Sequence, residues 1–218
     1  MVSQLFPEAA ATNAIQEDTA FLVVMGVCLF FFILVVVVMT YFCVKYRKGS
    51  SADRTGDVNS LPFELTWTAI PTLIGMGLFL MGASGYHDQK APPPDAMEIN
   101  VVGKQWMWKI QHPEGPREID ELHVPVNRPV KLLMTSEDVI HDFFIPAFRI
   151  KFDVLPGRVT TEWFQALKVG EYHLFCSQYC GFDHSEMTGK VVVMAPQDYQ
   201  QWLIHGSSGP WPVAPVVP

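Results

Sequence analysis

Two long apolar segments without a charged residue lie in the first part of the chain. Phe21 to Val44 contains 24 residues, and Leu65 to Tyr86 is of similar length. At ~1.5 Å per residue, a helix formed by either segment could cross a hydrocarbon core of ~30 Å. Core helices of a soluble protein are the alternative, but such helices usually carry a polar face, which neither segment has. We therefore expect transmembrane helices at 20–44 and 64–86.

The charges beside these segments predict their orientation. Four Lys and Arg residues lie in the connecting loop at 45–63, whereas residues 1–19 contain three acidic residues and no Lys or Arg. The positive-inside rule places the loop in the cytoplasm and both ends of the helix pair outside. All residues after the second helix are therefore expected on the outer side of the membrane.

The part of the chain after the second apolar segment has a different pattern. A proline-rich linker at 87–95 separates the helices from a domain at 96–204, and an irregular tail is expected at 205–218. Short segments rich in β-branched and aromatic residues, broken by Pro and Gly, predict strands at 97–102, 106–111, 130–135, 159–166, 171–175 and 190–194. Several short strands at this spacing are typical of an all-β sandwich or barrel. A short helix is expected at 196–202, with Pro196 in its first turn.

The expected outer part is acidic. From Asp88 onward it contains 16 Asp and Glu residues against 11 Lys and Arg residues. An excess of negative charge disfavours nucleic acid as a partner and favours a basic protein that associates rapidly and in a salt-sensitive way.

One segment of this outer part concentrates the side chains that bind soft metals. Cys176 and Cys180 are four residues apart, His184 follows four residues later, and Met187 three residues after that. Thiolate, imidazole and thioether groups favour copper over magnesium or calcium. His141 lies 35 residues before Cys176 and offers a second imidazole. A disulfide is the alternative in an oxidising compartment, but it would leave the histidines and the methionine unexplained.

Several stretches of this sequence resemble subunit II of the haem-copper cytochrome c oxidases. They are Ser136 to Pro146, Lys151 to Arg158, Cys176 to Met187, Gln105 to Trp108, and Glu64 to Pro71 at the start of the second apolar segment. The resemblance extends over roughly residues 20 to 204. It implies a two-helix transmembrane hairpin followed by an all-β, cupredoxin-like Greek-key sandwich or barrel.

The resemblance also implies a dinuclear copper centre, called copper A, and a set of ligands. The implied ligands are Cys176 and Cys180 as bridging thiolates, His141 and His184 through imidazole, Met187 through its thioether, and Gln178 through its backbone carbonyl. Most members of the family have Glu at the position of Gln178, where the carboxylate helps to hold a magnesium ion. A neutral amide is a poorer ligand for a hard cation, so we do not expect this subunit to share a magnesium site. The other histidines are not assigned to a metal: His87, His112, His123, His173 and His205.

Two further residues receive roles from the resemblance. Trp106 corresponds to the surface tryptophan at which electrons enter, and an ordinary packed aromatic is the alternative. Glu64 corresponds to an acid at the start of a proton-uptake path, and a hydrated interfacial acid is the alternative. Asp153 and Arg158 match positions at the interface with subunit I, where we expect ion pairing. Candidate charges for docking a donor are Glu114, Asp120, Glu121, Glu137, Asp138 and Asp142.

The resulting prediction is the electron-input subunit of a respiratory cytochrome c oxidase in a bacterial plasma membrane, with its copper domain on the periplasmic side. The donor would be cytochrome c or a c-type haem domain. Subunits I and III would be partners, and haem and copper B would reside only in the partner subunit. Three alternatives stay open: a nitric oxide reductase that uses copper A, a quinol oxidase subunit II without copper ligands, and a membrane-tethered copper chaperone.

Overall fold

The computed structural model describes residues 6–56, 60–113 and 115–205. The chain divides into two compact units. One consists of residues 18–85, and the other combines the residues up to Glu17 with those from Tyr86 onward. The expected tail lies outside the described residues except for His205, which ends a helix.

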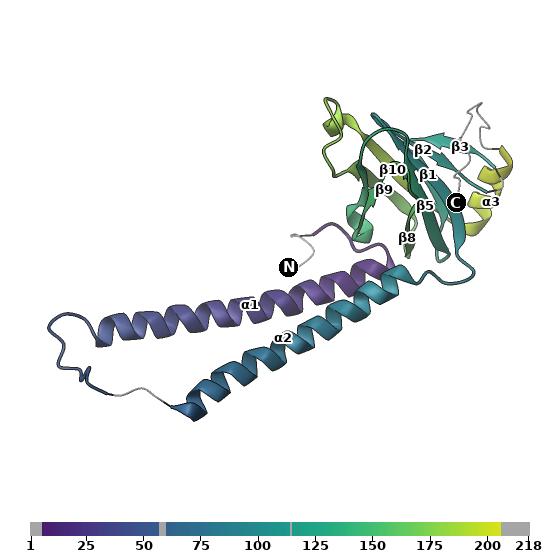
Figure 1. Ribbon diagram of the computed structural model, residues 1–218. Coiled ribbons are helices and arrows are strands. Elements are labelled where there is room, and N and C mark those ends of the chain that lie inside the picture. The colour runs from purple at the N-terminus through teal and green to yellow at the C-terminus, as the bar shows by residue number, and fades with distance from the viewer. Residues whose placement is uncertain (1–5, 57–59, 114, 206–218) are drawn as a thin grey trace. The chain divides into compact units, whose positions relative to one another are not determined.

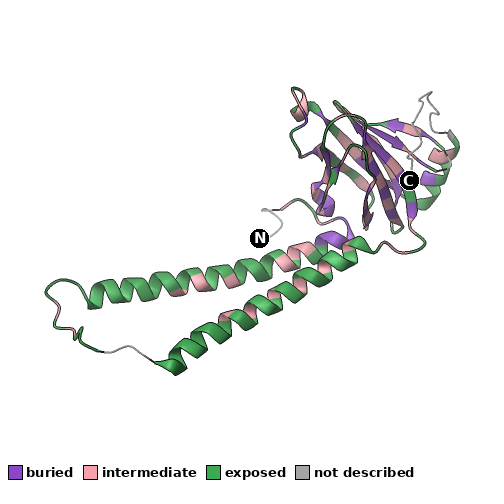
Figure 2. Ribbon diagram, viewed as in Figure 1, coloured by how far each residue is buried: buried purple, intermediate pink, exposed green. Residues whose placement is uncertain are grey.

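Two long helices contain the apolar segments. They are α1 (Thr12–Lys45) and α2 (Leu61–Lys90). Within the unit formed by residues 18–85, no residue in the most apolar 18-residue window of either helix is buried. Figure 2 shows both helices exposed over most of their length. Core helices of a soluble protein would be covered by the rest of the chain. These side chains instead present apolar surface of the kind that a bilayer covers.

Both helices are longer than the sequence analysis expected. Helix α1 begins at Thr12 rather than at 20, and α2 continues to Lys90, so the linker begins after Lys90 rather than at 87. Hydropathy identifies only the residues that favour lipid. Gln16, Glu17 and Gln89 are polar but are good helix formers. Each helix therefore continues beyond its apolar stretch, to Thr12 in α1 and to Lys90 in α2.

The unit that contains the residues from Tyr86 onward, which we call the outer unit, is a sandwich of two five-stranded sheets (Figure 1). The first sheet has the order β3-β2-β1-β5-β8, formed by β3 (Arg117–Ile119), β2 (Met107–Gln111), β1 (Met97–Lys104), β5 (Pro129–Ser136) and β8 (Thr160–Gln165). The second has the order β4-β10-β9-β6-β7, formed by β4 (Glu121–Pro125), β10 (Thr188–Met194), β9 (Gly170–Cys176), β6 (His141–Ile145) and β7 (Ile150–Val154). Buried and partly exposed residues alternate strictly along β5 and β8, as expected when one face of a strand packs on a core. Large side chains from both sheets fill the interior, including Trp108, Phe143, Phe164, Leu132 and Leu174.

The prediction of an all-β sandwich is therefore confirmed, but four strands were not anticipated: β3, β4, β6 and β7. They are short: β3 has three residues, and β4 and β7 alternate polar and apolar residues over only five residues each. Strand β6 (His141–Ile145) has four buried residues out of five, so it shows no period of two. Only pairing with β7 and β9 defines it as a strand.

A polar cluster fastens the last described helix, α3 (Pro196–His205), to the sandwich. Glu118 on β3 accepts a hydrogen bond of 2.7 Å from His112 Nε2 and another from His123 Nδ1. Tyr199 of α3 donates to His112 Nδ1 at 3.1 Å, and Trp202 stacks on His123 with ring centroids 4.5 Å apart. Burial raises the pKa of Glu118, but the hydrogen bonds from the two imidazoles outweigh burial and hold this pKa below its usual range.

Candidate metal centre

The soft ligands gather at one end of the second sheet. His141 is the first residue of β6 and Cys176 is the last residue of β9, and these two strands pair in antiparallel register. The loop that follows Cys176 contains a short 3-10 helix, His184–Glu186, and returns at Met187. The Cys176 backbone N–H donates to the Met187 carbonyl at 3.1 Å, which closes the loop. Sheet pairing and a closed loop together bring His141 beside a segment 35 residues away.

Each cysteine of this loop has one histidine neighbour. The Sγ atoms of Cys176 and Cys180 lie 3.8 Å apart. His141 Nδ1 lies 3.8 Å from the sulfur of Cys176, and His184 Nδ1 lies 3.5 Å from the sulfur of Cys180. A disulfide needs sulfurs ~2.05 Å apart, and both thiols are free in the structure. The four side chains form a symmetric set, a thiol pair flanked by two imidazoles.

Two weaker donors complete the set of six expected ligand groups. Met187 Sδ lies 3.8 Å from the sulfur of Cys180, and the backbone carbonyl of Gln178 lies 3.3 Å from the sulfur of Cys176. Met187 is 1% exposed, whereas the Gln178 residue is exposed and presents only its backbone toward the sulfurs. The structure thus brings all six groups to one place, with each sulfur close to one additional weak donor.

The pKa values of the two thiols are shifted in opposite directions. Burial raises the pKa of Cys176, but hydrogen bonding, first from His141, lowers it to a net value of about 7. Burial and the neighbouring Cys176 raise the pKa of Cys180. Two adjacent thiols cannot both ionise unless positive charge compensates them. A soft cation would supply that charge, and this set of thiols, imidazoles and a thioether therefore fits copper.

Residues outside the ligand set hold His141 in place. Its ring contacts Gly103, where an added Cβ would lie 2.9 Å from His141 Cδ2, so only glycine permits this approach. Its Nε2 lies 2.9 Å from Asp138 Oδ1. Asp138 was predicted only as a docking charge, and no role was predicted for Gln105, whose side chain donates to the Cys180 carbonyl at 2.7 Å. A carboxylate three residues before a ligand histidine was the available signal, because ligand imidazoles commonly donate their second N–H to a carboxylate.

Trp106 lies against the metal-site loop. It was expected to begin a strand at 106–111, but β2 begins at Met107, so Trp106 sits in the turn between β1 and β2 and its indole packs beside Gly181. Gly181 has φ +127°, and an added Cβ there would lie 3.2 Å from Trp106 Nε1 and Cζ2. The glycine therefore provides both the backbone conformation and the space for the indole to reach the residue after Cys180. Trp108, by contrast, is fully buried and packs on Phe143 with ring centroids 5.0 Å apart.

The other residues that the sequence suggested for a role lie outside the metal-ligand cluster or outside the described residues. Glu64 lies in the first turn of α2, in the unit formed by residues 18–85, and is not part of the cluster. Asp142 is 4% exposed and accepts a hydrogen bond of 2.5 Å from Ser177 Oγ, so its assignment as a docking charge is wrong. Glu114 lies outside the described residues. Two exposed aromatic residues on the loop, Tyr179 and Phe182, escaped the sequence analysis because a single exposed aromatic has no sequence signature.

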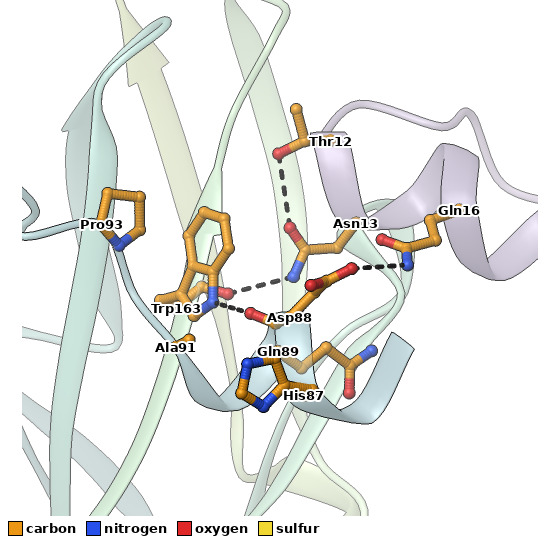
Figure 3. Close-up of a pocket in the computed structure, with 9 residues that line it drawn as sticks. All are labelled: Thr12, Asn13, Gln16, His87, Asp88, Gln89, Ala91, Pro93 and Trp163. Carbon is orange, nitrogen blue, oxygen red and sulfur yellow. Dashed lines mark hydrogen bonds between the residues drawn. The ribbon is translucent and has the colours of Figure 1, made fainter. Parts of the chain in front are cut away.

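A separate hollow of about 390 Å³ lies between the first turn of α1 and the end of α2 (Figure 3). The Trp163 indole donates to the Asp88 carbonyl at 3.0 Å, and Asn13 donates to the Trp163 carbonyl at 3.2 Å. Gln16 of the same turn reaches the Asp88 carboxylate at 3.4 Å. The described lining contains no cysteine or methionine. These contacts attach the N-terminal segment to β8, and the imidazole of His87 has no thiol or thioether beside it in the described lining.

Comparison with known families finds relatives over most of the chain. The family model described as "Cytochrome C oxidase subunit II, periplasmic domain" matches residues 116–195, and the one described as "Cytochrome C oxidase subunit II, transmembrane domain" matches residues 1–83. The alternative cytochrome c oxidase subunit 2 of Bradyrhizobium diazoefficiens is 30% identical over 88% of this chain and 81% of its own length. The cytochrome c oxidase subunit 2 of Thermostichus vulcanus is 29% identical over 98% of this chain and 81% of its own length.

A solved structure agrees with the fold of the outer unit. The periplasmic domain of subunit II of cytochrome oxidase of Bradyrhizobium japonicum aligns with a TM-score of 0.50 and 31% identity, covering 52% of this chain and 95% of that chain. This likeness confirms the cupredoxin-like β-sandwich, and in the structure the two apolar helices α1 and α2 precede it in the chain. Together with the match to the transmembrane family model, the two uncovered apolar helices identify a membrane protein.

Proposed function

This chain belongs to the cytochrome c oxidase subunit II family, and on that basis we propose that it is the electron-input subunit of a respiratory haem-copper oxidase. It accepts electrons from a cytochrome c or a c-type haem domain outside the membrane. It passes them to haem in subunit I, where oxygen is reduced and protons are pumped. The arrangement of two free cysteines, each beside its own histidine, is the observation that carries this proposal.

We assign the copper ligands to the residues that the fold gathers. Cys176 and Cys180 would hold the copper through their thiolates, His141 and His184 through their imidazoles, and the Met187 thioether would be a weak donor. The Gln178 carbonyl is the other weak donor. When bound, a copper pair of this kind carries one electron shared between two ions, which reduces the structural change on reduction. The protein supplies a rigid and nearly dry setting, since Cys176, Cys180 and Met187 are 7%, 3% and 1% exposed.

The surface beside Trp106 is suited to a transient partner. The indole lies next to the loop that carries the ligands, and the exposed Tyr179 and Phe182 extend the apolar surface of that loop. Nearby Glu137 contributes negative charge, although Lys104 and Lys109 pair with it at 3.3 and 2.7 Å. We propose that a basic donor docks here and that Trp106 is the point at which electrons enter.

The proposed location is a bacterial plasma membrane, with the copper domain in the periplasm and the loop at 45–63 in the cytoplasm. The excess of Lys and Arg in that loop supports this orientation. The partners we propose are subunit I and subunit III. Gln178 supports the absence of a magnesium site shared through this subunit, because its exposed amide lacks the negative charge that the ion favours.

Metal analysis and electron paramagnetic resonance (EPR) of the intact complex test the assignment of copper A. We expect two copper ions in the outer domain of each copy of this chain, and a multi-line spectrum from one unpaired electron shared by both. Haem analysis of the large subunit that co-purifies separates an oxygen-reducing complex from a nitric oxide reductase. A single labile Cu(I) without a mixed-valence spectrum would instead identify a copper chaperone.

Glu64 is our candidate for proton uptake from the cytoplasm. It lies in the first turn of α2, beside the loop that the charge pattern assigns to that side. In the complex, Glu64→Gln is expected to slow turnover while leaving the EPR spectrum unchanged, because the amide cannot carry a proton in exchange. Turnover and proton uptake by oxidase vesicles provide the measurement. Unchanged uptake in the variant would leave Glu64 as a hydrated interfacial acid.

A further inference from the structure

We propose that Asp138 is a positioning residue that joins the ligand His141 to the turn carrying Trp106, an inference that rests on the proposed function. One carboxylate makes both connections. Its Oδ1 lies 2.9 Å from His141 Nε2, and its Oδ2 accepts a hydrogen bond of 2.8 Å from the backbone N–H of Gln105. Asp138 thereby ties a metal ligand to the residue immediately before the tryptophan.

The hydrogen bond between Asp138 and His141 selects the tautomer of the imidazole. A carboxylate accepts hydrogen bonds and donates none, so His141 Nε2 must carry the proton. The lone pair of the neutral ring is then on Nδ1, the atom 3.8 Å from the sulfur of Cys176. His141 is 0% exposed, so bulk water is not available to replace the carboxylate. Asp138 therefore prepares the ring to bind a metal through Nδ1.

The second connection reaches the other half of the site. The Gln105 backbone is held by Asp138, while its side-chain Nε2 donates to the Cys180 carbonyl at 2.7 Å. Gln105 thus links Asp138 to the second bridging cysteine. Trp106 follows directly and packs on Gly181, the residue after Cys180. Through these two hydrogen bonds the turn between β1 and β2 is held against both ligand segments.

Asp138 is itself held firmly. The backbone N–H of Val139 donates to Oδ1 at 2.7 Å, and Ser136 Oγ lies 3.3 Å from the same oxygen. The Asp138 side chain is 25% exposed. A residue that served only to attract a basic partner would need charge and exposure but no such set of donors. The geometry favours positioning, and the docking role becomes the competing outcome of the test.

Three variants separate the two connections. Asp138→Ala removes both. Asp138→Asn keeps the shape, but it has only one acceptor oxygen, so its amide nitrogen must face either His141 or Gln105. Gln105→Leu keeps the backbone N–H bonded to Asp138 and removes only the hydrogen bond to Cys180. Glu137→Gln is the matched control, because it removes one negative charge at the adjacent position and its side chain pairs with lysines rather than with the ligands.

The measurements use the full chain in detergent and the intact complex. In copper-free chain labelled with ¹⁵N-histidine, the His141 resonances, identified with a His141→Gln variant, report which nitrogen carries the proton. We expect wild type to carry it on Nε2 and Asp138→Ala to show a mixture. Copper affinity should fall about 10- to 100-fold in Asp138→Ala, the usual cost of losing such a partner. Gln105→Leu should retain copper and its EPR spectrum but accept electrons more slowly.

Ionic strength separates positioning from docking. The effect of Glu137→Gln on the rate of electron uptake should shrink as salt screens the surface, whereas the effect of Asp138→Ala should persist. If Asp138→Ala shows the same His141 resonances and the same copper affinity as wild type, the inference is wrong. It is also wrong if the defect of Asp138→Ala in electron uptake disappears at high salt. If wild-type chain lacks the shared-spin EPR spectrum, the proposed function fails. The ¹⁵N experiment on copper-free chain still decides the role of Asp138 in that case.

Discussion

Replacing Cys176 with serine is expected to abolish the shared-spin EPR signal and the turnover of the oxidase. The Cys176 sulfur lies at the centre of the site, 3.8 Å from both Cys180 Sγ and His141 Nδ1 and 3.3 Å from the Gln178 carbonyl. A serine hydroxyl is a hard donor that stays protonated at neutral pH, so it cannot replace a bridging thiolate. EPR spectra, copper content and oxygen consumption of the purified complex provide the measurements.

Cys43→Ser is the matched control for this experiment. The same sulfur-to-oxygen change then takes place in α1, at an exposed cysteine far from the ligand loop in sequence. We expect this variant to retain both copper ions and full turnover. Full copper and turnover in Cys176→Ser would refute the ligand assignment. Loss of both in Cys43→Ser would instead point to damage to the assembly.

The second large effect is expected from Trp106→Ala, which should slow electron uptake by orders of magnitude without altering the EPR spectrum. The indole occupies the space beside Gly181, and an alanine would leave a gap between the docked donor and the ligand loop. Electron transfer slows steeply as the gap between donor and acceptor widens. No ligand atom belongs to Trp106, so the metal site itself should persist. Stopped-flow reduction by a reduced cytochrome c measures the rate.

Trp106→Phe tests whether an aromatic ring at this position is sufficient. A phenyl ring retains part of the contact with the loop, so we expect a rate between those of wild type and the alanine variant. If Trp106→Ala accepts electrons as quickly as wild type, the tryptophan is an ordinary packed side chain and electrons enter elsewhere. A changed EPR spectrum in Trp106→Ala would show that the indole supports the ligands instead.

The local pattern of residues was sufficient for the features that depend on residue type. Uncharged runs of lipid-crossing length identified α1 and α2, because transfer into a bilayer depends mainly on composition. The spacing from Cys176 to Met187 identified the soft-ligand loop, because a single short loop can bring such residues together. The predicted helix ends at 20 and 86 were wrong, since the helices extend to Thr12 and Lys90 through polar turns that no hydropathy pattern detects.

Long-range pairing determined the rest. The β6–β9 ladder places His141 beside Cys176, and β6 carries no alternating pattern that reveals it in advance. The same fold buries Asp142, which the charge pattern had suggested for docking, and turns Asp138 toward a ligand. The sequence alone therefore determined which chemical groups are available. Only the tertiary structure decided which groups meet, because strand register and side-chain direction depend on contacts between residues far apart in the chain.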